Sequence, residues 1–293
     1  MKVIVTIPAY NEEATIGTVI RDVRKVMDLQ KLDYKIIVVD DGSTDNTKNI
    51  GQKAGALVFS HPANYGLAEA FRTEIQKCLE LGADVIVHTD ADGQYRAADI
   101  PKLLAKIKQG YDLVLGSRFL GHIEAMSFVK RLGNKAFSRV ISNITRVKIT
   151  DAQTGFRAFT RMVAEKVVVT SYHTYTQEQV IRAVREKFTV AEVPVYFAKR
   201  HGKSRLISNP FEYAANAWIN LLRIYRDYEP LKFFGLVGSF FLIVGFLIGL
   251  RLVFLYLTSG VVGKIPSVIL CMLLLTMGLQ IILFGFLADM RNR

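Results

Sequence analysis

The sequence predicts an α/β fold with a mostly parallel sheet, followed by two transmembrane helices. Two observations predict this architecture. Through residue 116, short apolar runs rich in β-branched residues alternate with segments whose apolar residues recur at helical spacing. That alternation is typical of a parallel sheet with helices on both faces. Residues 231–288 are then almost continuously apolar, which favours a membrane anchor.

The predicted elements follow one another along the chain. The expected strands are residues 2–7, 34–40, 57–60, 84–89, 111–116 and 188–197, with one more short strand after the polar loop 151–157. The expected helices cover about residues 12–28, 45–54, 64–81, 97–109, 124–145 and 177–187. We therefore expect a soluble domain at 1–206, an amphipathic helix at 207–230 and a two-helix anchor at 231–293.

Composition indicates the class of partner and the state of the two cysteines. The net charge of +12 favours an anionic partner such as phosphate groups, acidic lipid or nucleic acid. The apolar tail favours lipid headgroups and phosphate, and because no nucleic-acid-binding module is recognisable, nucleic acid is not expected as a partner. Cys78 falls in an expected helix and Cys271 in the apolar tail, so no disulfide is expected.

The tail contains two uncharged segments. Residues 233–250 reach about 27 Å at 1.5 Å per residue, and residues 266–288 form a second candidate span. The preceding segment places Trp218 among apolar and polar residues at helical spacing, as a helix in the membrane interface does, although a core helix of the soluble domain is the alternative. The pattern Gly245-x-x-x-Gly249 permits close helix packing and leaves a homo-oligomer open.

The charges beside the two spans predict their orientation. Two spans return the chain to its starting side, which carries Lys232, Arg291 and Arg293, whereas the turn between the spans has only Lys264. Basic residues concentrate on the cytosolic side of membrane proteins. The N-terminus also leads directly into a strand, without a signal peptide. We therefore expect a multi-pass protein of the cell membrane whose soluble domain lies in the cytosol.

Four polar clusters follow expected strands. They are Pro8–Tyr10, Asp40–Asp41, Asp90–Asp92 and Arg118. Ligands of such sheets bind outside the carboxyl ends of the strands, so these clusters should converge at one edge. The segment 90–94, Asp-Ala-Asp-Gly-Gln, can direct two carboxylates and an amide oxygen to one side of a turning chain. Such hard oxygen ligands suit Mg²⁺ or Mn²⁺, although a solvated Asp-Gly turn is the alternative.

Together the motifs resemble those of the inverting GT-A glycosyltransferases of family 2. More narrowly, the chain resembles polyprenyl-phosphate hexose synthases of the dolichyl-phosphate mannose synthase type. The matching segments are IPAYNEE (7–13), VVDDGSTD (38–45), NYGLAEA (64–70), DADGQY (90–95), GSRF (116–119), DAQTGFRAF (151–159) and RHGKSR (200–205). The resemblance implies a Rossmann-like GT-A catalytic domain. It also implies transfer of a single sugar, because processive members carry a Gln-x-x-Arg-Trp motif and the only tryptophan here, Trp218, follows Ala217.

The resemblance implies a role for each matching position. Nucleotide contacts are expected from Pro8, Ala9, Tyr10, Glu12 and Val39, with Asp41 as the acidic partner of the base and Asp90 and Ala91 beside ribose and diphosphate. The expected ligands of Mg²⁺ or Mn²⁺ are Asp92 and Gln94. The basic residues expected to hold the phosphates of donor and acceptor are Arg118, Arg131, Arg200 and Lys203. Among all of these, Asp92, Arg118 and Arg131 are the expected catalytic residues.

The implied reaction is inverting transfer of one hexose from a nucleotide-diphosphate sugar to dolichyl or polyprenyl phosphate at the cytosolic membrane face. The resemblance favours GDP-mannose as the donor. The alternatives are a UDP-glucose-dependent polyprenyl-phosphate glucosyltransferase, transfer to a non-lipid acceptor, and an inactive membrane-anchored scaffold. Because a phosphate monoester with a second pKa near ~6 is largely ionised at neutral pH, we expect no strong general base.

Overall fold

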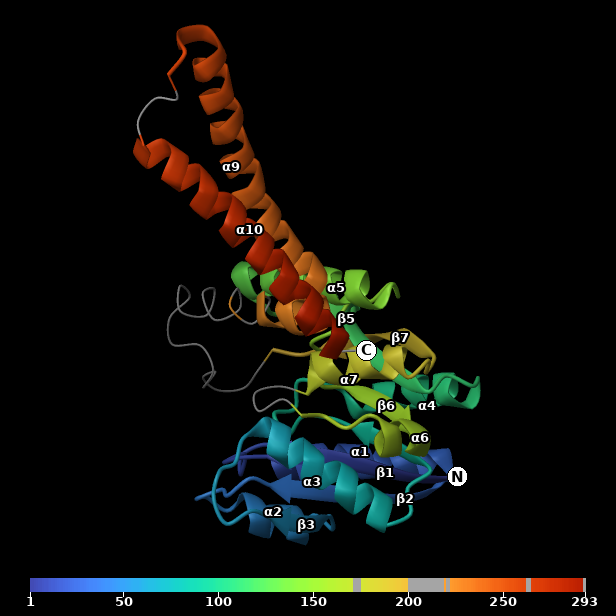
Figure 1. Ribbon diagram of the computed structural model, residues 1–293. Helices are drawn as coiled ribbons and strands as arrows, with labels where there is room; N and C mark the ends of the chain where they lie inside the picture. The colour runs from blue at the N-terminus through green and yellow to red at the C-terminus, as the bar shows by residue number, and fades with distance from the viewer. Residues whose placement is uncertain (171–174, 200–218, 220–221, 262–264, 292–293) are drawn as a thin grey trace. The chain divides into compact units, whose positions relative to one another are not determined.

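The computed structural model describes residues 1–170, 175–199, 219, 222–261 and 265–291 (Figure 1). The chain divides into two compact units, Met1–Pro210 and Phe211–Arg293. The first unit contains the sheet, and the second contains two long apolar helices.

The sheet of the first unit has seven strands in the order β3-β2-β1-β4-β6-β5-β7. The strands are β1 (Lys2–Ala9), β2 (Asp33–Asp40), β3 (Leu57–Ser60), β4 (Val85–His88), β5 (Leu113–Ile123), β6 (Arg157–Thr160) and β7 (Val190–Phe197). Neighbouring strands are parallel except where β6 pairs with β4 and β5. The predicted mostly parallel sheet is therefore confirmed, and β6 is the strand that runs in the opposite direction.

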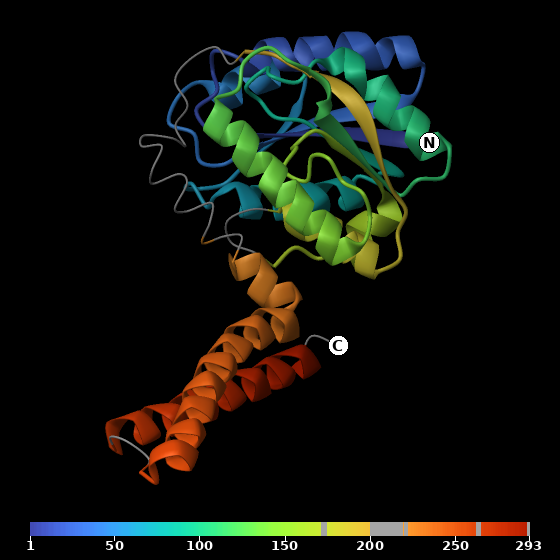
Figure 2. The same cartoon turned by 90° about the horizontal axis from the view of Figure 1, so that it is seen from above.

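Helices cover both faces of the sheet (Figures 1 and 2). They are α1 (Ile16–Gln30), α2 (Thr47–Lys53), α3 (Leu67–Glu80), the short 3-10 helix η1 (Ala97–Asp99), α4 (Ile100–Lys108), α5 (Phe128–Thr145), α6 (Arg161–Lys166) and α7 (Thr176–Arg185). Alternate residues of β1, Val3, Val5 and Ile7, join the buried side chains of α1 and α4 in one core cluster. Because successive side chains of a strand point to opposite faces, the residue between them, Ile4, belongs to the other face, where α3 packs against β1 and β2.

The region after β5 differs from the prediction. We expected a strand at 111–116 and a helix at 124–145, but β5 continues to Ile123 and α5 begins only at Phe128. The strand continues because Gly121 lies against the backbone of Val195 in β7, where an added Cβ would be only 2.0 Å from the carbonyl oxygen. The helix starts late because the Ser127 hydroxyl accepts a hydrogen bond from the backbone N–H of Lys130, which is a typical N-cap.

The second unit consists mainly of α9 (Pro230–Ser259) and α10 (Ile265–Arg291). Both helices are long and apolar enough to cross a membrane, and only 6% and 17% of their most apolar windows are buried. Exposed apolar surface of this extent needs an apolar surrounding, so the two helices suggest association with a membrane. Most of the predicted helix at 207–230 lies outside the described residues; residues 222–228 are helical.

Glycines allow α9 and α10 to pack closely. A Cβ added to Gly238 would lie 2.7 Å from the carbonyl oxygen of Gly278, and one added to Gly278 would lie 2.8 Å from that of Gly238. Gly245 packs against the side chains of Leu274 and Leu275. Small residues at such crossings let two backbones approach, and the resulting van der Waals packing favours association of helices in lipid. Gly238 and Gly245 of α9 are therefore used inside this helical hairpin.

Replacing Gly238 by leucine should destabilise the hairpin, because the new side chain would meet backbone atoms that cannot move aside. Overpacking of this kind costs about 1–3 kcal/mol. Thermal unfolding of the full chain in detergent should show a lower midpoint. The matched control is Gly235→Leu in the same helix, where an added Cβ meets nothing within 4 Å. An equal loss in both variants would contradict the assigned packing.

Candidate functional site

The predicted polar clusters meet at one edge of the sheet. Strand β1 lies between β2 and β4, so the carboxyl ends of these three parallel strands are adjacent. The antiparallel strand β6 begins at this edge, because Arg157 pairs with His88 at the end of β4. The end of β7 reaches the same edge through an isolated bridge between Phe197 and Tyr95. Crevices at the carboxyl edge of open α/β sheets are the usual ligand sites.

The loop after β1 is fastened to the loop after β2. The backbone N–H of Asn11 donates to Ser43 Oγ at 2.8 Å, and the N–H of Thr44 donates back to Asn11 Oδ1 at 2.7 Å. Asn11 has a φ of 52°, a left-handed conformation that asparagine tolerates better than most residues. The N–H of Glu12 donates to Thr47 Oγ1 at 2.8 Å. These bonds fix the backbone on either side of the expected nucleotide contacts.

The expected nucleotide contacts differ in exposure. Tyr10 is 37% exposed and Glu12 is half-buried, so both side chains are accessible to a ligand. Pro8 and Ala9 are buried at the end of β1. Val39 is fully buried inside β2, where its side chain belongs to the core. Tyr10 and Glu12 are therefore the members of this set whose side chains reach the surface.

Asp41 is buried and strongly hydrogen-bonded. Its Oδ1 accepts the N–H of Tyr65 at 3.0 Å and lies 2.7 Å from His61 Nδ1, while Oδ2 accepts the N–H of Gly66 at 2.8 Å. Gly66 has a φ of 91°, a conformation that favours glycine. The backbone N–H of Asp41 donates to the Ala9 carbonyl and so joins the ends of β1 and β2, while the carboxylate binds the segment after β3.

The segment after β4 turns sharply and brings three polar side chains to the edge. Gly93 has a φ of 72°, and the N–H of Gln94 donates to Asp92 Oδ1 at 3.1 Å. The Gln94 amide nitrogen donates to the Ala198 carbonyl at 3.0 Å, just beyond β7. Burial and the nearby Asp92 carboxylate raise the pKa of Asp90 to about 6. Gly155 lies against Asp90, because a Cβ there would be 2.7 Å from Asp90 Oδ1.

This donor set fits a hard divalent cation. The two carboxylates of Asp90 and Asp92 are close enough to raise a pKa, and a cation would relieve that repulsion. The hydrogen bond from the Gln94 nitrogen leaves its amide oxygen as the coordinating atom. No group of three or more His, Cys, Asp or Glu side chains with metal-site geometry occurs in the described part of the chain. Mg²⁺ needs only a few protein ligands when substrate phosphates complete its coordination shell.

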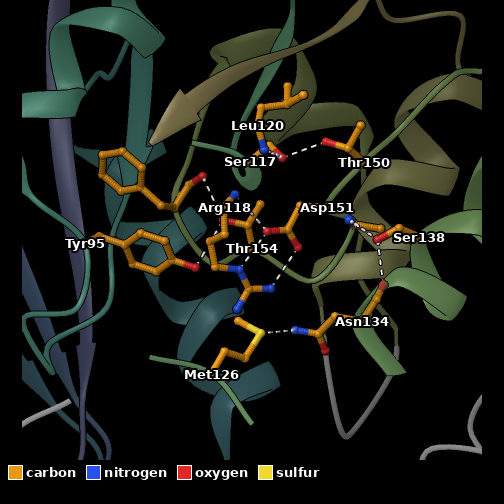
Figure 3. A network of polar contacts seen from close by, with 12 residues as sticks. Tyr95, Ser117, Arg118, Leu120, Met126, Asn134, Ser138, Thr150, Asp151 and Thr154 are labelled. Atoms are coloured by element: carbon orange, nitrogen blue, oxygen red, sulfur yellow. Dashed lines mark hydrogen bonds and ion pairs between the residues drawn. The ribbon is translucent and has the colours of Figure 1, made fainter. Parts of the chain in front are cut away.

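Arg118 lies in a buried polar network beside this edge (Figure 3). Its Nε and Nη2 donate to the two carboxylate oxygens of Asp151 at 2.6 and 2.8 Å, and both residues are almost fully buried. The carboxylate of Glu192 accepts the N–H groups of Thr150 and Asp151 and thereby holds the Asp151 backbone. Two of the three guanidinium nitrogens of Arg118 are therefore held by Asp151, which leaves Nη1 for the expected contact with a phosphate.

The other predicted basic residues lie further along the chain. Arg131 is exposed on the first turns of α5. Arg200 and Lys203 lie outside the described residues, directly after the Ala198 carbonyl that Gln94 holds. Sequence reasoning missed His61, although it follows β3 at the same edge and the strand-end rule would have identified it. It also missed Gly155 as a neighbour of Asp90 and Glu192 as a support of Asp151.

Comparisons with known proteins agree with this geometry. The model of the family "Glycosyl transferase family 2" matches residues 4–168. A dolichyl-phosphate hexose transferase of Haloferax volcanii is 34% identical over 71% of this chain and 86% of its own length. A UDP-N-acetylglucosamine–dolichyl-phosphate N-acetylglucosaminyltransferase of Methanococcus voltae is 32% identical over 64% of this chain and 82% of its own length.

A solved structure shares the fold. Glucosyl-3-phosphoglycerate synthase from Mycobacterium tuberculosis, in complex with Mn²⁺ and uridine-diphosphate-glucose, superposes with a TM-score of 0.58 at 21% identity. The superposition covers 76% of this chain and 78% of that structure. The predicted GT-A fold is thereby confirmed. The polar edge, the family match and the fold together show that the chain belongs to glycosyl transferase family 2 and is a glycosyltransferase.

Proposed function

We propose that this enzyme transfers one hexose, with inversion, from a nucleotide-diphosphate sugar to dolichyl or polyprenyl phosphate at a membrane surface. The observation that carries the proposal is the carboxyl edge of the sheet, where Asp90, Asp92 and Gln94 follow β4 and the buried carboxylate of Asp41 follows β2, in a chain that also has two apolar helices. The two relatives named for transfer to dolichyl phosphate support the choice of acceptor.

The donor has two candidates. The resemblance to dolichyl-phosphate mannose synthases favours GDP-mannose. The name of the Methanococcus voltae relative contains a UDP-sugar, and the Mycobacterium tuberculosis structure contains UDP-glucose, so a UDP-hexose is the second candidate. Both donors present a diphosphate to the same edge, and the reaction is the same for either.

The chain's own residues position the two substrates. Asp92 and Gln94 would hold Mg²⁺ or Mn²⁺, which when bound stabilises the charge that develops on the leaving diphosphate. Arg118, Arg131, Arg200 and Lys203 would hold the phosphates of donor and acceptor. The acceptor phosphate is already ionised near neutral pH, so its oxygen attacks the anomeric carbon without a general base. Catalysis then depends on placement and charge neutralisation.

The membrane arrangement belongs to the same proposal. We propose a multi-pass protein of the cell membrane with its catalytic unit in the cytosol. The support is the distribution of basic residues, with Lys232 and Arg291 at the two ends of the helical hairpin that face the same side. A cytosolic catalytic unit would have direct access to nucleotide sugars and to the phosphate group of the lipid.

A transfer assay tests the function. The full chain in detergent is incubated with Mn²⁺, radiolabelled nucleotide sugars and dolichyl phosphate, and the organic phase is examined for a lipid-linked hexose. We expect one hexose per lipid phosphate and no polymer. Transfer only to soluble sugars or peptides, with none to the lipid, would favour the non-lipid acceptor and overturn the proposal.

Replacing Arg131 by alanine should weaken use of the lipid acceptor. The exposed guanidinium would contact the acceptor phosphate, and loss of one charge-assisted hydrogen bond corresponds to a roughly 10-fold higher KM for dolichyl phosphate. The KM for the sugar nucleotide should change little. The control is Arg161→Ala, because Arg161 is also exposed but lies beside Asp84 at the opposite edge of the sheet. If both variants behaved alike, Arg131 would have no specific role.

A further inference from the structure

We infer that the donor site is built for uracil rather than guanine, because the carboxylate of Asp41 has room for a single further hydrogen bond. The inference rests on the proposed function and on the role that the family resemblance implies for Asp41, as the acidic partner of the base. It specifies the donor class as a UDP-sugar and assigns His61 as the residue that determines the preference.

The count of hydrogen bonds carries the inference. An ionised carboxylate offers about four acceptor positions, two on each oxygen. In Asp41, Oδ1 is used twice, by His61 Nδ1 at 2.7 Å and by the N–H of Tyr65 at 3.0 Å. Oδ2 is used once, by the N–H of Gly66 at 2.8 Å. Counting the partners that the described residues provide, one position remains, and it is on Oδ2.

The two candidate bases need different numbers of acceptors. Uracil has one ring N–H, at N3, which a single carboxylate oxygen can accept. Guanine presents two adjacent donors, N1–H and the N2 amino group, which are matched by a carboxylate that offers both of its oxygens. In this site Oδ1 is already saturated, so guanine would bind Asp41 through one donor and leave the other unpaired against a protein surface. An unpaired donor is penalised in a desolvated site.

The carboxylate cannot rotate to free its second oxygen. Its two backbone donors come from consecutive residues, Tyr65 and Gly66, just before α3. His61 is held in turn, because its Nε2 lies 2.8 Å from Thr73 Oγ1. When Nδ1 donates to Asp41, Nε2 of the same neutral ring accepts the hydrogen bond of the threonine hydroxyl. Asp41 is 4% exposed, so a donor bonded to its carboxylate would be shielded from water.

Isothermal titration of the full chain with UDP, GDP, CDP and ADP in the presence of Mn²⁺ tests the inference. We expect UDP to bind at least ~10-fold more tightly than GDP, the effect of about one lost or unpaired hydrogen bond. Tighter binding of GDP, CDP or ADP than of UDP would overturn the inference. It would leave the proposed function intact if lipid transfer from the corresponding sugar nucleotide were still observed. If the chain binds no nucleotide and transfers no sugar, the proposed function itself fails.

Two variants of His61 separate its bond to Asp41 from its contribution to folding. His61→Asn keeps a donor at the position of Nδ1 and should keep the UDP preference. His61→Leu removes that donor and opens a second acceptor position on Oδ1, so the ratio of the two dissociation constants should fall to within ~3-fold. Thermal unfolding shows whether each variant is folded. If the folded leucine variant kept the full preference, His61 would not determine it.

Discussion

Replacing Asp92 by alanine is expected to reduce hexose transfer nearly to background. The variant would lose the carboxylate that we propose to hold the divalent cation beside the leaving diphosphate, and removal of one such charge-stabilising group lowers kcat by on the order of 10³-fold. Hexose incorporation into dolichyl phosphate, measured with saturating Mn²⁺, checks this result. The fold should persist, because Asp92 is only half-buried.

The matched control for this variant is Asp22→Ala, which removes an exposed carboxylate from α1. Its transfer rate should equal that of the unmodified enzyme. Binding of the nucleotide without metal should survive in Asp92→Ala, since the base and its acidic partner are untouched. A folded Asp92→Ala enzyme with normal Mn²⁺-dependent turnover would show that the cation, if used, is held elsewhere.

Replacing Arg118 by methionine should destabilise the catalytic unit by about 3–5 kcal/mol, because the buried carboxylate of Asp151 would lose its ion-pair partner. Thermal unfolding would report this loss as a lower midpoint. Transfer activity should also be lost, since Arg118 is a candidate contact of the substrate phosphates.

A second change separates these two effects. In the double variant Arg118→Met with Asp151→Leu, apolar side chains replace both charges, and such replacements often restore stability. We expect the double variant to recover most of the unfolding temperature while transfer stays at least ~100-fold reduced, as expected when a phosphate-binding arginine is absent. Recovery of activity together with stability would show that Arg118 supports the structure and contacts no substrate.

Much of the fold was predictable from local patterns. The strands at 57–60 and 84–89, and the helical segments around α1 and α3, were recognisable from the spacing of apolar residues and from the polar residues that end strands. Both signals are local in sequence. The end of β5 was not predictable, because the extension of this strand depends on the contact of Gly121 with Val195, which is distant in sequence. The direction of β6 also has no local signal, because antiparallel pairing with β4 and β5 is a property of the assembled sheet.

The candidate site was likewise predictable only in part. The sequence places Asp41, Asp90 and Asp92 at strand ends, and the sheet brings those ends together. It does not reveal that Arg118 is held by Asp151 or that Asp41 already has three donors, because these partners come from separate loops. Hydrogen bonds between side chains that are tens of residues apart depend on the folded geometry, and only that geometry shows which acceptor positions remain.

The reversed direction of β6 determines how this enzyme can be divided. A fragment ending at residue 150 would contain Asp41, Asp90 and Asp92, yet β4 and β5 would both lack the strand that joins them. Such open strand edges promote aggregation. It would also lack Gly155 beside Asp90 and the Ala198 carbonyl that holds Gln94. No proteolytic or engineered half of the catalytic unit is therefore expected to show partial activity, and reconstitution from split pieces would require both pieces to fold together.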